Sequence, residues 1–182
     1  MLALSVAAVL GTAGMGTAHA QTHAGNAGTA RTAADAVKAM VGERGAQARP
    51  DSRVVCYRAH VAGIGWQSPV CNGQVAGTTG QSRAIEALEV ATSGVGGICV
   101  EAHAADIGWQ GIRCGGDLQN VTVGTTGEAR RMEALWLNPR SGSVSAQAHV
   151  QNYGWTGWYS GNPVTVGTTG ASLRLEAVQI TV

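Results

Sequence analysis

Apolar and polar residues alternate along much of the chain with the period of two that is typical of β-strands. In the segment 173–182, LRLEAVQITV, apolar residues take the odd positions up to Ala177 and the even positions from Val178 onward. That change of parity predicts either a β-bulge or a strand that is buried on both faces. The segment 144–150, VSAQAHV, alternates in the same way and predicts another strand.

The alternating segments belong to a unit that occurs three times, at 54–90, 99–137 and 144–182. Each copy contains an AH dipeptide, then a GW dipeptide, a GTTG tetrapeptide and an EA dipeptide. The step from His to Trp, and the step from the last Gly of GTTG to Glu, is six residues in every copy. Only the stretch between Trp and GTTG varies in length, as expected for a loop between fixed elements. The polar anchors of the unit are His60, His103, His149, Glu86, Glu133 and Glu176.

Each copy is long enough for three or four short strands, and Gly and Asn mark the joins between them. One such unit cannot bury a hydrophobic face alone, so three of them are expected to close around a pseudo-three-fold axis. The sequence therefore predicts an all-β domain. A β-prism, with three sheets as the faces of a triangular prism, is favoured over a β-trefoil because the turns are short enough for a meander.

The four cysteines occupy two positions of the unit, ten residues before its GW tryptophan and five residues after it. Copies one and two have cysteine at both positions, whereas copy three has Ser145 and Ser160. Because the two cysteines are present or absent together, we expect them to pair within a copy. The spacing lacks the CxxC of common zinc sites. The expected disulfides, across adjacent antiparallel strands, are Cys56–Cys71 and Cys99–Cys114.

The first 53 residues lie outside the repeats. Residues 1–20 are uncharged and mostly apolar, and end in Ala18-His19-Ala20, with small residues where a signal peptidase cleaves. We interpret this stretch as a secretory signal peptide, because its apolar run from Leu2 to Leu10 is too short, and the sequence after it too interrupted by Gly, to span a bilayer. Residues 21–53 are rich in Ala, Gly, Thr and Arg, which predicts a flexible linker. Thr32 and Asp35 have the spacing of a capping box, so a short helix over 32–40 is the alternative.

The joined pattern of AH, GW, GTTG and EA resembles the ChW repeat, the clostridial hydrophobic repeat with conserved tryptophan, over 54–182. The resemblance implies a secreted or surface-displayed module that acts in adhesion or in binding a polymer or protein. One departure concerns the second tryptophan of the family's GWxxW segment. It is present only as Trp158, and the equivalent residues of copies one and two are Pro69 and Ile112.

Length and charge narrow the class of protein further. The chain has 182 residues, a formal net charge of +1 and only 13% charged residues. That length fits a single domain with a real core. A nucleic-acid-binding protein needs a basic surface to neutralise phosphates, which this balance does not supply. We expect no nucleic-acid partner, no membrane span, and a monomer.

The tryptophans of the unit have two interpretations. As core residues repeated in every copy, Trp66, Trp109 and Trp155 would form part of the scaffold and replace the absent Phe, and this interpretation is favoured. As exposed rings they would form a stacking platform for sugars or aromatic side chains. Copy three supports the second interpretation, because one small hairpin cannot bury all its aromatic residues. The candidate ligand-binding residues are Tyr153, Trp155, Trp158, Tyr159, Trp66 and Trp109.

The repeated histidines and glutamates are candidates for chemistry as well as for structure. Three His around one axis would be able to bind a metal ion. We favour instead a hydrogen bond from each His to the backbone or to the Glu of its own copy, and expect no metal and no cofactor. No nucleophile elbow is present, and no GK[ST] follows GTTG, so we expect no enzyme.

These observations predict a secreted, non-catalytic binding module. The favoured partner is a cell-wall or other extracellular polysaccharide, and the localisation is extracellular, with association to the cell wall as a further expectation. A protein-interaction or adhesion module that meets a surface protein is the alternative. A small secreted hydrolase is the third hypothesis, and it would require a charged pocket that breaks the threefold pattern.

Overall fold

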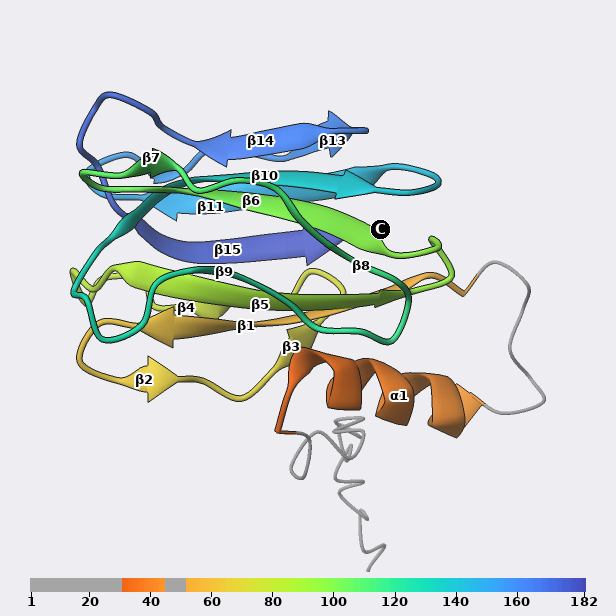
Figure 1. Cartoon of the computed structure of the whole chain (residues 1–182). Helices are drawn as coiled ribbons and strands as arrows, with labels where there is room; N and C mark the ends of the chain where they lie inside the picture. The colour runs from red at the N-terminus through yellow and green to blue at the C-terminus, as the bar shows by residue number, and fades with distance from the viewer. Residues whose placement is uncertain (1–30, 45–51) are drawn as a thin grey trace, which may run out of the picture.

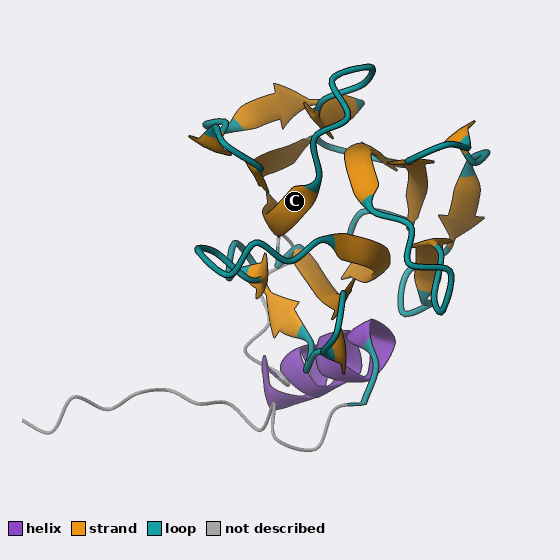
Figure 2. Ribbon diagram, turned by 90° about the vertical axis from the view of Figure 1, so that its left-hand side faces the viewer, coloured by secondary structure: helices purple, strands orange, loops and turns teal. Residues whose placement is uncertain are grey.

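Three five-stranded antiparallel sheets stand around a common axis as the faces of a triangular prism (Figures 1 and 2). The computed structural model describes residues 31–44 and 52–182. The three sheets correspond to the three repeats and do not join into the closed barrel of a trefoil. The predicted all-β, prism-like architecture is therefore confirmed. The expected signal peptide at 1–20 lies outside the described residues.

Every sheet is built from four strands of one repeat and one strand of another. Sheet one contains β1 (Val54–Val61), β2 (Gly65–Trp66), β3 (Val70–Cys71), β5 (Ile85–Ser93) and β9 (Val121–Gly124). Sheet two contains β6 (Ile98–Ala104), β7 (Gly108–Trp109), β8 (Arg113–Gly115), β10 (Met132–Pro139) and β14 (Val164–Gly167). Sheet three contains β11 (Val144–Val150), β12 (Gly154–Trp155), β13 (Tyr159–Gly161), β15 (Leu175–Thr181) and β4 (Ala76–Gly77).

The borrowed strand is always the one that leads into GTTG. Repeat two gives β9 to sheet one, repeat three gives β14 to sheet two, and repeat one gives β4 to sheet three. Glycine makes this crossing possible. Gly124 has a φ of +88°, and a Cβ on it would stand 2.3 Å from the backbone oxygen of Glu86. The three repeats therefore interlock in a closed ring.

The hydrophobic core fills the prism between the inner faces of the three sheets. Alternate strand residues point into it, most of them Val, Leu, Ile and Ala. Tyr57 is the largest fully buried side chain, and its hydroxyl donates to the carbonyl oxygen of Gln74 and accepts a 2.9 Å hydrogen bond from the N–H of Ile180. Burial raises the pKa of Tyr57 to about 12. Aliphatic residues and one buried tyrosine thus build this core.

The predicted change of strand parity is a β-bulge, and it recurs in all three repeats. On β15, Ala177 pairs with His149 and Leu175 pairs with Val150, so Glu176 is the extra residue. The register shifts at Glu86 and Glu133 in the same way. The bulge leaves Leu175 and Val178 both facing the core. The repeated glutamate is therefore the one residue of the bulge that has no register partner on the neighbouring strand.

One helix, α1 (Ala33–Arg44), packs against sheet one (Figures 1 and 2). The prediction of a flexible linker over 21–53 is wrong for this segment, and the alternative helix near 32–40 is present. Its small apolar residues recur at helical spacing, and they pack on the outer face of sheet one, the side away from the prism axis. The residues of this contact are Ala33, Ala34, Ala36, Val37, Met40, Val54, Cys56, Cys71 and Ala91.

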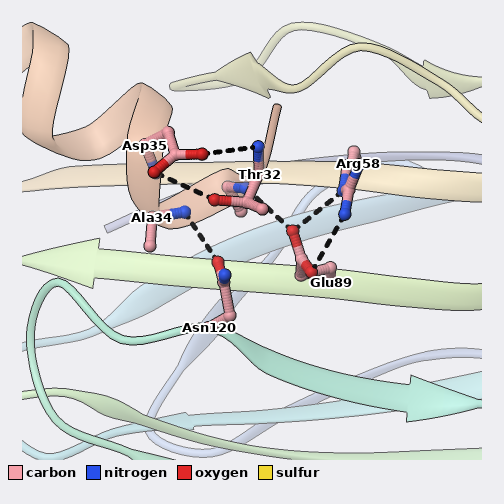
Figure 3. Close-up of polar contacts among 7 residues, drawn as sticks. Thr32, Ala34, Asp35, Arg58, Glu89 and Asn120 are labelled. Carbon is pink, nitrogen blue, oxygen red and sulfur yellow. Dashed lines mark hydrogen bonds and ion pairs between the residues drawn. The ribbon is translucent and has the colours of Figure 1, made fainter. Parts of the chain in front are cut away.

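The start of α1 is capped from within the helix and from the sheet (Figure 3). Thr32 and Asp35 form the predicted capping box, with reciprocal backbone-to-side-chain hydrogen bonds of 3.1 Å. The hydrogen bond from the Thr32 side chain lowers the pKa of Asp35. The N–H groups of Ala33 and Ala34 donate to Glu89 and Asn120, at 2.9 and 2.7 Å. These bonds satisfy donors that a helix end otherwise leaves unpaired.

The outer face of sheet one is apolar where it lies under α1, and this explains why the helix packs on this sheet. Val54 and Ala91 are buried beneath the helix. Where sheet one has Ala91, sheet two has Asn138 and sheet three has Thr181, and both of these are only partly buried. The apolar face of the helix can bury apolar surface against Ala91 of sheet one, whereas the equivalent residues of sheets two and three are polar.

Both expected disulfides are present. Cys56 is bonded to Cys71 and Cys99 to Cys114, each across a pair of antiparallel strands. In sheet three, the hydroxyls of Ser145 and Ser160 form a 2.6 Å hydrogen bond at the same register. Among the described residues, no helix has the length and hydropathy that a membrane crossing requires.

Candidate functional site

Each repeat places its GW tryptophan directly opposite its anchor histidine. Trp66, Trp109 and Trp155 end the short strands β2, β7 and β12, which pair with the long strand that carries the histidine. The imidazole stands edge-on to the indole, with ring centroids 5.4, 5.4 and 5.5 Å apart and interplanar angles of 78°, 83° and 83°. This is a favourable aromatic geometry, and it fixes the indole plane.

The histidine is fixed in turn by the bulged glutamate of its own repeat. The distance from the histidine Nδ1 to the glutamate Oε2 is 3.1 Å in repeat one, 3.2 Å in repeat two and 3.0 Å in repeat three. His60 makes a hydrogen bond to Glu86. The Nδ1 atoms of His103 and His149 lie as close to their glutamates but form no hydrogen bond. The predicted hydrogen bond between His and the Glu of its own copy is therefore present in repeat one, and in repeats two and three the two side chains are only in close contact.

Arginine completes the arrangement in repeats two and three. Arg131 lies 3.0 Å from Glu133, and Arg174 lies 2.7 Å from Glu176. Repeat one has Ala84 at this position, and Arg83 instead donates to the backbone oxygen of Ala62. The buried carboxylates of repeats two and three thus have a permanent cation beside them, which offsets the cost of burying their charge.

The three histidines stand on three different sheets, at β1, β6 and β11. Within residues 31–44 and 52–182, no group of three His, Cys, Asp or Glu side chains is placed to hold a metal ion. Each histidine faces the indole and carboxylate of its own repeat. The arrangement is therefore one of three separate, equivalent sites rather than one shared centre.

The favoured interpretation of the tryptophans as core residues is wrong. Trp66, Trp109 and Trp155 are 36%, 42% and 38% exposed. Each ends a two-residue strand at a sheet edge, where the indole packs against the histidine ring in a T-shaped contact and keeps more than a third of its surface exposed. We call these three residues the braced tryptophans.

Other apolar side chains are exposed near the braced tryptophans, and three of them, Ile64, Ile107 and Ile112, are not among the predicted ligand-binding residues. Ile64, Ile107 and Tyr153 stand in the hairpin turns, two residues before each tryptophan, and are 50%, 47% and 76% exposed. Ile112 and Trp158 follow three residues after it and are 57% and 48% exposed. Their equal offsets from Trp are the signal that would have found them. Tyr159, also a candidate residue, begins β13 and is exposed.

The residue two positions before each histidine also lies on the outer face, between two buried strand residues. In repeat one it is Arg58, whose guanidinium carbon lies 4.7 Å from the centroid of the Trp66 ring. Repeats two and three have Glu101 and Gln147 at this position. The three sites therefore share their aromatic geometry and differ in the charge next to it.

Comparison with protein families identifies the repeated unit. The family model described as Clostridial hydrophobic W matches the chain at residues 60–94, 103–138 and 149–182. Each matched range begins at an anchor histidine and includes the braced tryptophan, GTTG and the bulged glutamate. No curated protein and no solved structure matches the chain.

Proposed function

Because this chain belongs to the Clostridial hydrophobic W family, with three copies of its repeat, we propose that it is a secreted, non-catalytic module that binds an extracellular polysaccharide through the braced tryptophans. The single observation that supports the proposal most is the exposure of an oriented indole in every repeat. Sugar rings present C–H faces that pack on aromatic rings, with hydroxyls left for polar neighbours.

The bracing matters for affinity. An indole that is free to rotate loses conformational entropy when a ligand packs on it, whereas an indole held by a histidine has already been ordered by folding. The histidine is held by a buried glutamate, and in two repeats that glutamate is held by arginine. This chain of contacts supports a preorganised binding surface.

Three equivalent sites also suit a polymer. A polysaccharide repeats its chemistry along its length, so a second and third tryptophan would bind the same chain or the same particle without a new encounter. Weak individual sites then sum to useful avidity. The two disulfides support secretion, because such bonds persist in oxidising compartments.

The proposal is tested by co-sedimentation of the protein with isolated cell-wall polysaccharide, followed by intrinsic tryptophan fluorescence with soluble fragments. We expect binding that decreases stepwise in W66A, W109A and W155A and is lost in the triple variant. Val75→Ala is the matched control, because it removes an exposed apolar side chain that is not part of a braced site. Absence of binding and an unchanged fluorescence spectrum would overturn the proposal.

A protein partner is the second candidate function. Tyr153 and Tyr159 are 76% and 53% exposed, and exposed tyrosine and tryptophan are enriched at protein interfaces. Under this alternative, Y153A and Y159A abolish capture of a surface protein, while binding to polysaccharide is absent in the wild type as well.

A further inference from the structure

The outer face of each sheet has a constant part and a variable part. The braced tryptophan, its histidine and its glutamate are constant. The variable part is one pair of residues on the two long central strands, directly opposite each other in register. The pairs are Arg58–Glu89 in sheet one, Glu101–Trp136 in sheet two and Gln147–Gln179 in sheet three. Because this pair lies beside the aromatic platform, its chemistry decides what that face accepts.

Sheets one and two have charged residues at this position. In sheet one, Arg58 and Glu89 form a salt bridge of 2.8 Å, and Glu89 also accepts the hydrogen bond from the first N–H of α1 (Figure 3). The helix thus packs against the face beside this pair. In sheet two, Glu101 accepts a 2.8 Å hydrogen bond from the N–H of Gly111. A ligand at either face would meet an ionised group.

Sheet three has two amides instead. The Nε2 of Gln147 donates to the Oε1 of Gln179, and the Nε2 of Gln179 donates to the backbone oxygen of Gly73, both at 2.5 Å. This relay runs across the sheet from β11 through β15 to the turn after β3. Both glutamines are half-buried, so part of each amide still faces solvent.

Trp158 belongs to the same face. Its Cη2 atom lies 3.9 Å from the position that a Cβ on Gly73 would take, so the indole reaches the turn at which the amide relay ends. Trp158 is 48% exposed, and the braced Trp155 is 38% exposed. Gln147 stands two residues before His149 on β11, the same offset at which Arg58 reaches Trp66 in repeat one. Trp158 therefore lies against the turn where the amide relay ends, and Gln147 lies on the strand that pairs with the strand of Trp155.

This face has no net charge to offer a ligand. Repeat three contributes four strands to sheet three, and all four lie among the described residues. The acidic residue on these strands is Glu176. It is 5% exposed and paired with Arg174. An amide both donates and accepts hydrogen bonds and so matches a sugar hydroxyl. A carboxylate or ammonium group on the ligand would lose water here without gaining a counter-ion.

We propose that the outer face of sheet three is the specific binding site for an uncharged polysaccharide, with Trp155 and Trp158 as the stacking surfaces and Gln147 and Gln179 as the residues that select neutral sugar hydroxyls. This inference rests on the proposed function and assigns the ligand class of one of its three sites. The second tryptophan of the GWxxW segment is present only in repeat three, the repeat that builds this face.

The test is binding to a glycan array that contains neutral hexose chains, uronic-acid chains and amino-sugar chains. We use the W66A/W109A variant, which keeps only the braced tryptophan of sheet three, and expect it to prefer neutral chains at least tenfold. Gln147→Met and Gln179→Met, added to this variant, keep the side-chain length and remove both amides, and we expect a tenfold or greater loss on neutral chains. Gln81→Met is the matched control, an exposed glutamine outside this face.

A second variant makes the result independent of any effect on folding. Trp158 is exposed, so W158A should leave the melting temperature unchanged and still weaken binding to neutral chains tenfold. If charged chains bind W66A/W109A as tightly as neutral ones, or if the two glutamine substitutions do not weaken its binding to neutral chains, the inference is wrong and the proposed function stands. If the wild type binds no glycan and its fluorescence is unchanged, both are wrong.

Discussion

His149 and Trp155 face each other across two antiparallel strands, with their ring planes at 83° and their centroids 5.5 Å apart. The same pairing recurs in the other two repeats, and in each the histidine touches a glutamate that occupies a β-bulge. The bulge therefore has a role at the surface: it places a carboxylate where it orients an exposed indole.

Replacing the histidine should cost more in repeat one than in repeat three. Among the described residues, Glu86 has its side-chain contact with His60, a hydrogen bond, whereas Glu176 keeps its ion pair with Arg174 when His149 is removed. We expect H60A to lower the free energy of unfolding by about 2 kcal/mol and H149A by about 1 kcal/mol. Urea titration measures both, and equal losses would contradict the role assigned to arginine.

The glycine at the crossing of two repeats should be hard to replace. A Cβ on Gly124 would meet the Glu86 oxygen at 2.3 Å, and its φ is +88°. We expect Gly124→Ala to destabilise the protein by at least about 3 kcal/mol. Gly127→Ala is the control: its φ is +78° but it has open space, so only the backbone cost of about 1 kcal/mol applies. Similar losses for the two variants in thermal unfolding would refute the close-approach argument.

Repeat three should accept a third disulfide. Ser145 and Ser160 are register partners at the positions that the cysteines hold in the other two repeats. We expect the double variant S145C/S160C to form the bond when oxidised and to gain up to roughly 3 kcal/mol of stability from loop closure. Melting temperatures with and without reductant, compared with the wild type, give the gain, and free thiols after oxidation would count against this register.

Helix α1 should be separable from the prism. Val37 is fully buried against sheet one, so Val37→Asp would place a carboxylate in an apolar contact. We expect the helix to detach while the sheets stay folded, seen as at least tenfold faster amide exchange in α1 alone. Val41→Asp makes the same substitution at an exposed position of α1 and should leave the exchange close to that of the wild type. Faster exchange throughout the sheets would show that α1 is integral to the prism.

Alkaline pH should destabilise the core through Tyr57. Its pKa is raised from 10.0 to about 12, so the unfolded chain loses this proton at a lower pH than the folded protein. The contribution of the protonated Tyr57 to the free energy of unfolding is complete below pH 10. It falls by roughly 2 kcal/mol as the pH rises toward 12. Unfolding titrations across this range should show the loss. In Tyr57→Phe it should be smaller, and an unchanged slope would contradict the assignment.

The sequence predicts the features that depend on position within one repeat. The offsets of Cys56 and Cys71 from Trp66 predict their pairing, and the parity change beside Ala177 predicts the bulge. These signals are local, because neighbours in the sequence become neighbours on one sheet. The exposure of the tryptophans is not local in this sense. A strand of two residues has no alternation from which to tell which side of it faces the core.

Features that join different repeats were not predictable from the spacing. That β9 adds to sheet one depends on the closure of the whole ring, which no single segment encodes. The docking of α1 depends on Val54 and Ala91 being apolar on an outer face, and this face is defined only after the sheet exists. The small apolar residues of α1 are buried only because sheet one offers this face, and the sequence of α1 alone does not indicate such a contact.

The exchange of β4, β9 and β14 among the sheets limits how many repeats can fold together. A lone repeat lacks the strand that its neighbour supplies, and two repeats leave one sheet incomplete. A fourth repeat added to the chain would find every edge position already filled. Longer arrays built from this unit should therefore come in multiples of three, each triplet folding as one body. Loss of a single copy would break this exchange and open the ring, whereas a single added copy would have no sheet to join.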